Sequence, residues 1–129
     1  MSAQDTRFMA LALSLGRRGM GQCWPNPAVG CVIVKDGRIV GRGWTQPGGR
    51  PHAETEALAQ AGALARGATA YVTLEPCAHH GKTPPCADAL ISAGIARVVA
   101  PIEDSDTRVS GQGFARLREA GGTVKTGVL

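Results

Sequence analysis

After residue 52 the chain alternates between helical and strand-like patterns, and this order limits the fold more than any other feature of the sequence. Helical patterns run from 53 to 64, 87 to 93 and 113 to 120, and short apolar strands from 70 to 74, 97 to 102 and 123 to 128. Such alternation is typical of parallel strands joined by crossover helices that cover both faces of a sheet. It predicts an α/β fold.

The N-terminal third adds a helix and a hairpin to this pattern. An amphipathic helix over about residues 4 to 18 is predicted by apolar residues at helical spacing: Phe8, Leu11, Ala12 and Leu15. Apolar runs at 29–34 and 39–44 flank Asp36-Gly37, a pair that accepts the positive φ angles of a tight turn. We therefore expect a three-layer α/β/α sandwich around a mixed five-stranded sheet.

Composition and charge narrow the class of protein. A chain of 129 residues with 43% hydrophobic content is long enough to bury one core. No segment approaches the roughly 20 apolar residues of a membrane span. The apolar run at 9–15 does not look like an export signal, because it is short, is broken by Ser14, and is followed rather than preceded by Arg17 and Arg18. We expect one cytoplasmic domain without a membrane partner. The net charge of +4 admits a nucleic-acid partner. However, only 4% of the residues are aromatic, which leaves few side chains on which bases could stack, so we do not expect a nucleic-acid partner.

Potential metal ligands are concentrated in residues 75–86, EPCAHHGKTPPC, which hold two of the four cysteines and two of the three histidines. In a reducing compartment, cysteines are ligands, catalytic groups or core residues rather than disulfides. Cys77 follows a predicted strand, Cys86 lies at or near the start of the next helix, and His52 falls at the first turn of the preceding helix. All three can meet at the carboxyl end of the sheet. One histidine and two cysteines leave the fourth position of Zn²⁺ open, as in a catalytic site.

Other readings of the same residues stay open at this point. The cysteines and histidines can simply pack, and a structural zinc site closed by His79 or His80 also satisfies the spacing. The metal is favoured by His52-Ala53-Glu54 together with Pro76-Cys77. These match the zinc-deaminase signature H-x-E followed by P-C-x-x-C, in which the glutamate is the general acid and base, although the gap between the cysteines is longer here.

Several further motifs extend this match: Pro25-Asn26-Pro27, Val29-Gly30-Cys31-Val32-Ile33, residues 67–77 (GATAYVTLEPC) and residues 79–86 (HHGKTPPC). Together they resemble the deaminase domain of the bifunctional riboflavin-biosynthesis deaminase/reductase, within the cytidine/deoxycytidylate deaminase superfamily. The resemblance covers nearly the whole chain. Its most specific part is the long segment between the cysteines, because relatives that act on nucleosides or nucleic acids typically have two residues there.

The resemblance implies a zinc-dependent deaminase domain over residues 1–129, without the reductase domain, that acts as a homo-oligomer. The implied reaction removes the 2-amino group of 2,5-diamino-6-ribosylamino-4(3H)-pyrimidinone 5′-phosphate in riboflavin biosynthesis and releases ammonia. The implied zinc ligands are His52, Cys77 and Cys86, and the implied proton carrier is Glu54. Helix geometry alone favours Glu56 instead, since it lies four residues from His52. We expect His52 to lie at the open end of the helix, which reconciles the two.

The resemblance also implies contacts with the substrate. Asn26 offers an amide to the pyrimidine edge, Lys82 offers a point charge to the phosphate, and His79 and Asp104 are further substrate contacts. Cys23 and Cys31 are assigned to structure.

Two departures from the family pattern fall where substrate contacts are expected. Thr45 replaces a usual histidine, and Asp104-Ser105-Asp106-Thr107 replaces Asp-Pro-Asn-Pro. Two other functions therefore stay open. One is a related deaminase that acts on a free base, a nucleoside or tRNA. The other is a non-catalytic binding module stabilised by zinc, although a closed structural site would not need Glu54.

Overall fold

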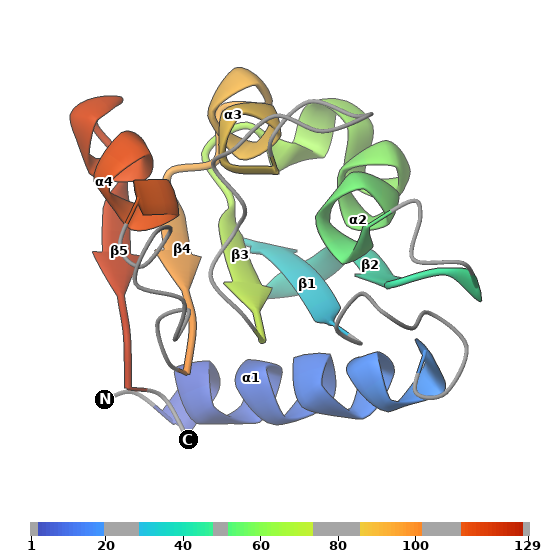
Figure 1. The fold of residues 1–129 in the computed structure, drawn as a ribbon. Coiled ribbons are helices and arrows are strands. Elements are labelled where there is room, and N and C mark those ends of the chain that lie inside the picture. Colours follow the sequence, from blue (N-terminus) through green and yellow to red (C-terminus); the bar gives the residue numbers. More distant parts are fainter. Residues whose placement is uncertain (1–2, 20–28, 48–51, 74–85, 102–111, 128–129) are drawn as a thin grey trace.

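A five-stranded sheet forms the centre of the computed structural model, which describes residues 3–19, 29–47, 52–73, 86–101 and 112–127 (Figure 1). The strands lie in the order β2-β1-β3-β4-β5. Their bounds are β1 Gly30–Lys35, β2 Arg38–Trp44, β3 Thr69–Val72, β4 Arg97–Val99 and β5 Thr123–Lys125.

The sheet is mixed, as the sequence predicts. β1 pairs antiparallel with both β2 and β3, whereas β3, β4 and β5 pair in parallel. The turn between β1 and β2 has positive φ at Asp36 (53°) and Gly37 (78°). Two consecutive positive φ angles match the right-handed twist of a hairpin, and this confirms the reading of the Asp-Gly pair.

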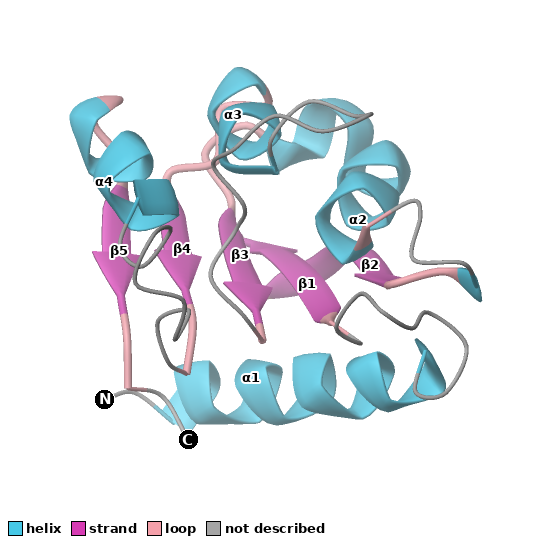
Figure 2. Ribbon diagram, viewed as in Figure 1, coloured by secondary structure: helices cyan, strands magenta, loops and turns pink. Residues whose placement is uncertain are grey.

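Helices cover both faces of the sheet, so the expected three layers are present (Figure 2). Helix α1 (Ala3–Gly16), continued by the 3-10 turn η1 (Arg17–Gly19), lies on one face. Helices α2 (Ala53–Ala61), α3 (Cys86–Ser92) and α4 (Gln112–Glu119) lie on the other. After α2 the chain continues as the 3-10 turn η3 (Gly62–Ala65) and enters β3.

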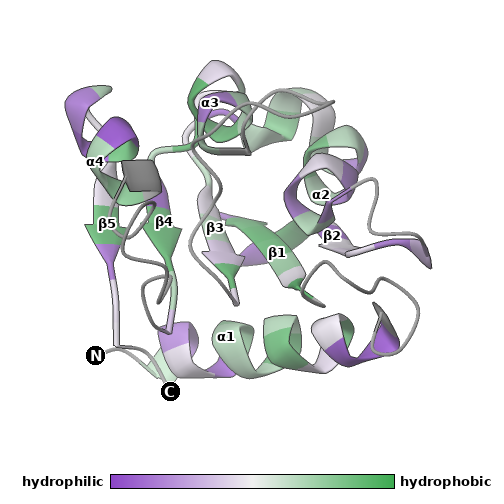
Figure 3. Cartoon of the chain, viewed as in Figure 1, coloured by the Kyte–Doolittle hydropathy of each residue, from purple (hydrophilic) through white to green (hydrophobic). Residues whose placement is uncertain are grey.

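Each face of the sheet has its own core. The α1 face is built around Phe8, Met9, Val32, Tyr71 and Val99. The opposite face is filled by small residues under α2 and by larger ones under α3 and α4, among them Ala53, Ala57, Leu90, Phe114 and Leu117. Side chains of a strand alternate between the two faces of the sheet, and here helices cover both faces. β1 is therefore hydrophobic along most of its length, whereas α4 is largely hydrophilic on its outer side (Figure 3).

Most differences from the sequence-based expectation concern element ends. The helical pattern expected to 64 changes to a 3-10 turn at Gly62, where φ is 56°. This backbone conformation suits glycine and ends an α-helix. The last two strands end at Val99 and Lys125, earlier than the apolar runs suggest; Ile102 and Val128 lie outside the described residues.

Two sets of polar contacts join elements that are distant in the sequence. Asp5 of α1 is bonded to Tyr71 of β3 and to Arg97 of β4, and Lys125 of β5 lies 3.4 Å from the same carboxylate. The Oε1 atom of Gln60 accepts a hydrogen bond from the backbone N–H of Arg42, 2.7 Å away, on the edge strand β2. Within the described ranges, no helix is both long and apolar enough to cross a membrane.

Candidate active site

The predicted site lies at one end of the sheet, where β1 begins and the other four strands end. We call this end of the strands the site edge. The register aligns Gly30 with Trp44, Cys31 with Val72, and Val99 with both Tyr71 and Lys125. The start of β1 therefore lies beside the ends of the other four strands. Because a helix between parallel strands runs back across the sheet, α3 and α4 also begin at this edge.

The predicted site residues fall in or next to the segments that leave this edge. His52 and Glu54 are described, and Cys86 is the first residue of α3, with only its backbone described. Five others lie outside the described residues: Asn26, Cys77, His79, Lys82 and Asp104. The described residues on either side of their segments, such as Val29, Thr73 and Pro101, lie at the ends of β1, β3 and β4.

His52 occupies the N-cap position of α2. Its backbone is extended (φ −71°, ψ 162°), and its carbonyl accepts a hydrogen bond from the backbone N–H of Glu56 at 3.1 Å. The side chain is half-buried. The expectation that His52 lies at the open end of the helix is therefore confirmed. An N-cap residue stands outside the helical spacing, so the i, i+4 relation between His52 and Glu56 does not put the two side chains on one face.

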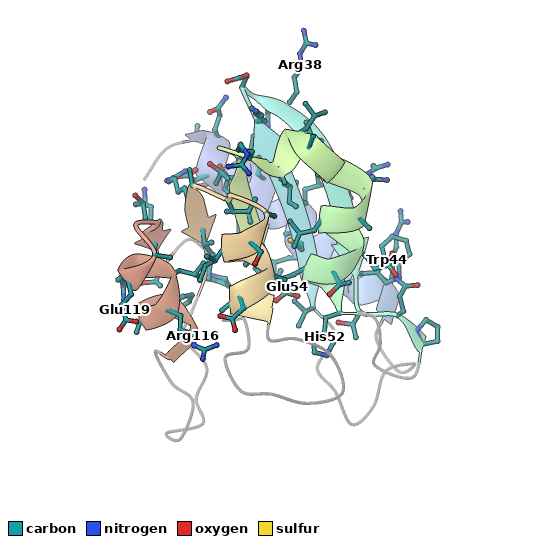
Figure 4. All side chains as sticks on the ribbon, turned by 90° about the horizontal axis from the view of Figure 1, so that it is seen from above. Arg38, Trp44, His52, Glu54, Arg116 and Glu119 are labelled. Atoms are coloured by element: carbon teal, nitrogen blue, oxygen red, sulfur yellow. The ribbon has the colours of Figure 1, made fainter. Side chains whose placement is uncertain are left out.

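The two glutamates of the first turn have different surroundings. Glu54 is only 5% exposed, whereas Glu56 is half-exposed. At about 100° per residue, positions two apart point to roughly opposite sides of a helix. The Glu54 side chain lies between α2 and α3, while Glu56 lies on the side of the edge strand β2, near Gly43 (Figure 4). The buried carboxylate is thus the one that faces the helix that begins with Cys86.

Cys31 of β1 lies under this region. The thiol is fully buried, and burial together with the nearby negative charge of Glu54 raises the pKa of Cys31 well above its ordinary value. A thiol in that state is protonated and unreactive. This agrees with the assignment of Cys31 to structure.

Comparison with known proteins gives the family. Residues 2–102 match the family described as the cytidine and deoxycytidylate deaminase zinc-binding region. The chain belongs to this deaminase family. Its resemblance to the riboflavin-biosynthesis branch is also confirmed, because the riboflavin biosynthesis protein RibD of Escherichia coli (strain K12) is 60% identical over 126 residues, 98% of this chain and 34% of that protein.

Two further relatives refine the comparison. The diaminohydroxyphosphoribosylamino-pyrimidine deaminase of Buchnera aphidicola subsp. Acyrthosiphon pisum is 52% identical over 125 residues, which are 97% of this chain and 85% of that protein. The structure of Acinetobacter baumannii RibD superposes with a TM-score of 0.94 and 51% identity, over 97% of this chain and 35% of that chain. The chain thus spans about a third of the RibD proteins but most of the shorter Buchnera deaminase.

The residues present suit the zinc that the family description names. An imidazole and two thiolates are ligands that zinc prefers. The His52 imidazole lies at the start of α2, the backbone of Cys86 begins the adjacent helix, and the buried Glu54 lies between the two helices. The His52 imidazole and the Glu54 carboxylate therefore lie at the end of the sheet where the chain leaves β3 toward Cys77, another predicted ligand.

Sequence reasoning missed the role of two threonines that hold the start of β1. The Thr45 hydroxyl accepts a hydrogen bond from the N–H of Val29 at 3.0 Å, and the Thr45 N–H donates to the Val29 carbonyl at 3.0 Å. Thr73 makes the same pair of bonds with Gly30, both 3.1 Å. Thr45, which replaces the family's usual histidine where a substrate contact is expected, is 2% exposed and bonded to the backbone of Val29. Its position after a strand gave no signal of this role.

Proposed function

We propose that this chain is a zinc-dependent aminohydrolase of riboflavin biosynthesis. Its proposed substrate is 2,5-diamino-6-ribosylamino-4(3H)-pyrimidinone 5′-phosphate, from which it removes the 2-amino group as ammonia. The observation that carries the proposal is the buried Glu54 beside His52 at the start of α2, in a chain that covers 85% of a relative named for this deamination. A closed structural zinc site would have no use for that carboxylate.

The reaction requires a water molecule with a lowered pKa and a side chain that transfers protons. One C–O bond forms at the amino-substituted ring carbon, one C–N bond breaks, and ammonia leaves. Bound zinc lowers the pKa of water enough for attack near neutral pH. In the proposal His52, Cys77 and Cys86 would hold the metal, which would supply the activated water.

Glu54 is the proposed proton carrier. Its carboxylate takes a proton from the attacking water and delivers it to the ring nitrogen, and it then carries the proton of the newly added hydroxyl to the departing amine. Burial between α2 and α3 suits this role, because a carboxylate shielded from bulk water keeps its proton for the substrate. Glu56, half-exposed on the side of β2, is not used.

The remaining contacts in the proposal orient the substrate. Asn26 bonds the pyrimidine edge, Lys82 pairs with the phosphate, and His79 and Asp104 complete the site. We also propose that the protein acts in the cytoplasm as a homo-oligomer, on a small molecule rather than on nucleic acid.

The direct experiment is ammonia release from a panel of aminopyrimidines, with bound metal measured on the same samples. The panel contains the phosphorylated riboflavin precursor, its dephosphorylated form, cytidine and deoxycytidylate. The proposal expects one Zn²⁺ per chain and a clear preference for the phosphorylated precursor. Turnover of cytidine or deoxycytidylate instead would assign the chain to another deaminase of the family. Stoichiometric zinc without turnover of any compound would favour a binding module.

A further inference from the structure

Helix α2 is in direct backbone contact with the edge strand β2 at two glycines. A Cβ atom built on Gly43 would lie against the Ala53 carbonyl oxygen, 2.7 Å from the Cβ of Glu56 and 2.8 Å from the backbone N of Ala57. A Cβ on Gly41 would lie against the Ala57 carbonyl oxygen and 3.1 Å from the Cβ of Ala61. Carbon atoms cannot approach that closely, so no other residue fits at these positions unless the helix moves.

Neither glycine is required by its own backbone conformation. The positive φ angles found among the described glycines belong to other positions, such as Gly37 and Gly62. What Gly41 and Gly43 supply is the absence of a side chain. The reason for glycine at these two places is therefore the approach of α2 and not a turn.

The helix is built to match this close approach. Its residues at the contact are Ala53, Ala57 and Ala61, all buried. Between the two glycines, the backbone N–H of Arg42 donates to the side chain of Gln60 on the same helix. Small residues on both surfaces and a hydrogen bond between them fix the distance between α2 and β2 within a narrow range.

The contact at Gly43 falls on the turn that carries the proposed chemistry. Ala53, whose carbonyl oxygen lies over Gly43, stands between His52 and Glu54 in the chain. Cys31 on β1 is the cross-strand partner of Gly43, and its buried thiol lies near the Glu54 carboxylate. By contrast, the contact at Gly41 falls one turn further along the helix.

We propose that Gly43 is a positioning residue for the deaminase reaction. The missing side chain sets the depth at which the first turn of α2 rests on the sheet, and through it the places of the His52 imidazole and the Glu54 carboxylate. This inference rests on the proposed function for its catalytic consequence, but the seating of the helix itself can be measured without turnover.

The test compares Gly43→Ala with Gly30→Ala as a matched control. Gly30 also excludes a side chain, since a Cβ there would lie against the Ala12 carbonyl oxygen and 2.7 Å from the N of Gly16, but that contact is with α1 on the opposite face. Both variants add one methyl group against a helix backbone, and both are expected to lower Tm. Only Gly43→Ala should displace the first turn of α2. Gly41→Ala tests whether the effect depends on the turn that is touched.

Three measurements are made on each variant, well below its Tm. Amide NMR spectra of the metal-free protein should show the largest shifts at residues 52–57 in Gly43→Ala and along α1 in Gly30→Ala. The visible spectrum of the Co²⁺-loaded protein should change in Gly43→Ala alone. For Gly43→Ala, kcat should fall about 10- to 100-fold with a much smaller change in KM, as expected when reacting groups are displaced by a fraction of an ångström to about 1 Å.

The inference is overturned if Gly43→Ala and Gly30→Ala lower kcat in proportion to their loss of stability and leave the Co²⁺ spectrum unchanged. If Gly43→Ala does not fold, Ala53→Gly removes a buried methyl group from the same turn of α2, changes how that turn packs on the sheet, and should show the same spectral change and kcat loss. An unaltered Ala53→Gly would then contradict the inference. Failure of the wild-type protein to release ammonia would count against the proposed function only, because the amide shifts still report where the first turn sits.

Discussion

The Asp5 carboxylate on α1 is held by the Arg97 guanidinium on β4 in a two-point ion pair, with Nη1–Oδ1 2.9 Å and Nη2–Oδ2 2.6 Å. The Tyr71 hydroxyl donates to the same carboxylate at 2.7 Å, and Lys125 approaches it at 3.4 Å. Asp5 is almost fully buried, while Arg97 and Lys125 remain partly exposed. One carboxylate thus connects α1 to the three parallel strands β3, β4 and β5.

Asp5→Asn is expected to lower the free energy of unfolding at pH 7 by about 2–4 kcal/mol. Removing one partner of a buried ion pair costs about 3–5 kcal/mol, and the lower range applies because Arg97 and Lys125 can reach water. The bonds from Arg97 hold the pKa of Asp5 well below its usual value. The stabilisation is therefore complete above the unfolded-state pKa of about 4 and is lost as the pH falls below it. Urea unfolding of both proteins between pH 7 and pH 3 measures this.

The matched control is Asp88→Asn. Asp88 and Arg116 are 2.7 Å apart, but both side chains are about 40% exposed. An exposed pair contributes about 0–1 kcal/mol. Equal losses for Asp5→Asn and Asp88→Asn, or a difference from wild type that persists unchanged to pH 3, would show that the buried pair does not stabilise the fold in this way.

Tyr71 should resist ionisation in the folded protein. Burial and the hydrogen bond to Asp5 raise the pKa of Tyr71 to about 12. A raised pKa means that the stability contributed by the neutral phenol is complete below about pH 10 and is lost as the pH rises toward 12. Tyr71 is the single tyrosine of the chain, so its phenolate absorbance can be followed directly. A titration near pH 10 in the folded protein would contradict this, and Asp5→Asn should move the titration to lower pH.

Thr45→Val is expected to destabilise the protein by about 1–3 kcal/mol, because the buried N–H of Val29 loses its acceptor. Thr45→Ser keeps the hydroxyl and should lose about 0.8 kcal/mol for one buried methyl group. Thermal or chemical unfolding of both variants gives the comparison. A valine variant as stable as the serine variant would mean that the hydroxyl does not hold the start of β1.

Lys82→Ala should reduce the preference for phosphorylated over dephosphorylated substrate while bound zinc stays constant. A charge-assisted contact to a phosphate contributes about 1.5–3 kcal/mol, which is about one to two decades in kcat/KM. Steady-state kinetics with both substrates on wild type and variant measures the effect. Equal use of the two substrates by the wild-type protein would reject the phosphate contact.

Local patterns in the sequence predicted much of the fold. Periodicity located the helices and strands, and the Asp36-Gly37 pair located the hairpin, because these depend on neighbouring residues. The Asp5–Arg97 pair joins positions 92 residues apart, and no local pattern indicates it. No local pattern accounts for Gly41 and Gly43 within β2, and only the close approach of α2 explains them.

The site was predicted less evenly. The helical pattern from residue 53 predicted the start of α2, and helical spacing pointed to Glu56 because it treated His52 as part of the helix. In the structure His52 is the N-cap with an extended backbone, so the helical period begins at Ala53. Of the eight predicted site residues, His52 and Glu54 have described side chains; for the zinc and substrate contacts the roles stay predictions.

The comparison of Glu54→Gln with Glu56→Gln tests the central claim most directly. Ammonia release from the phosphorylated aminopyrimidine and bound zinc are measured for both variants and for the wild type. The account predicts that Glu54→Gln keeps zinc and fold but lowers kcat by about 10²- to 10⁴-fold, because an amide cannot carry the proton. Glu56→Gln, on the half-exposed side of α2, should stay close to wild type. Near-normal turnover by Glu54→Gln, or a loss confined to Glu56→Gln, would contradict the account.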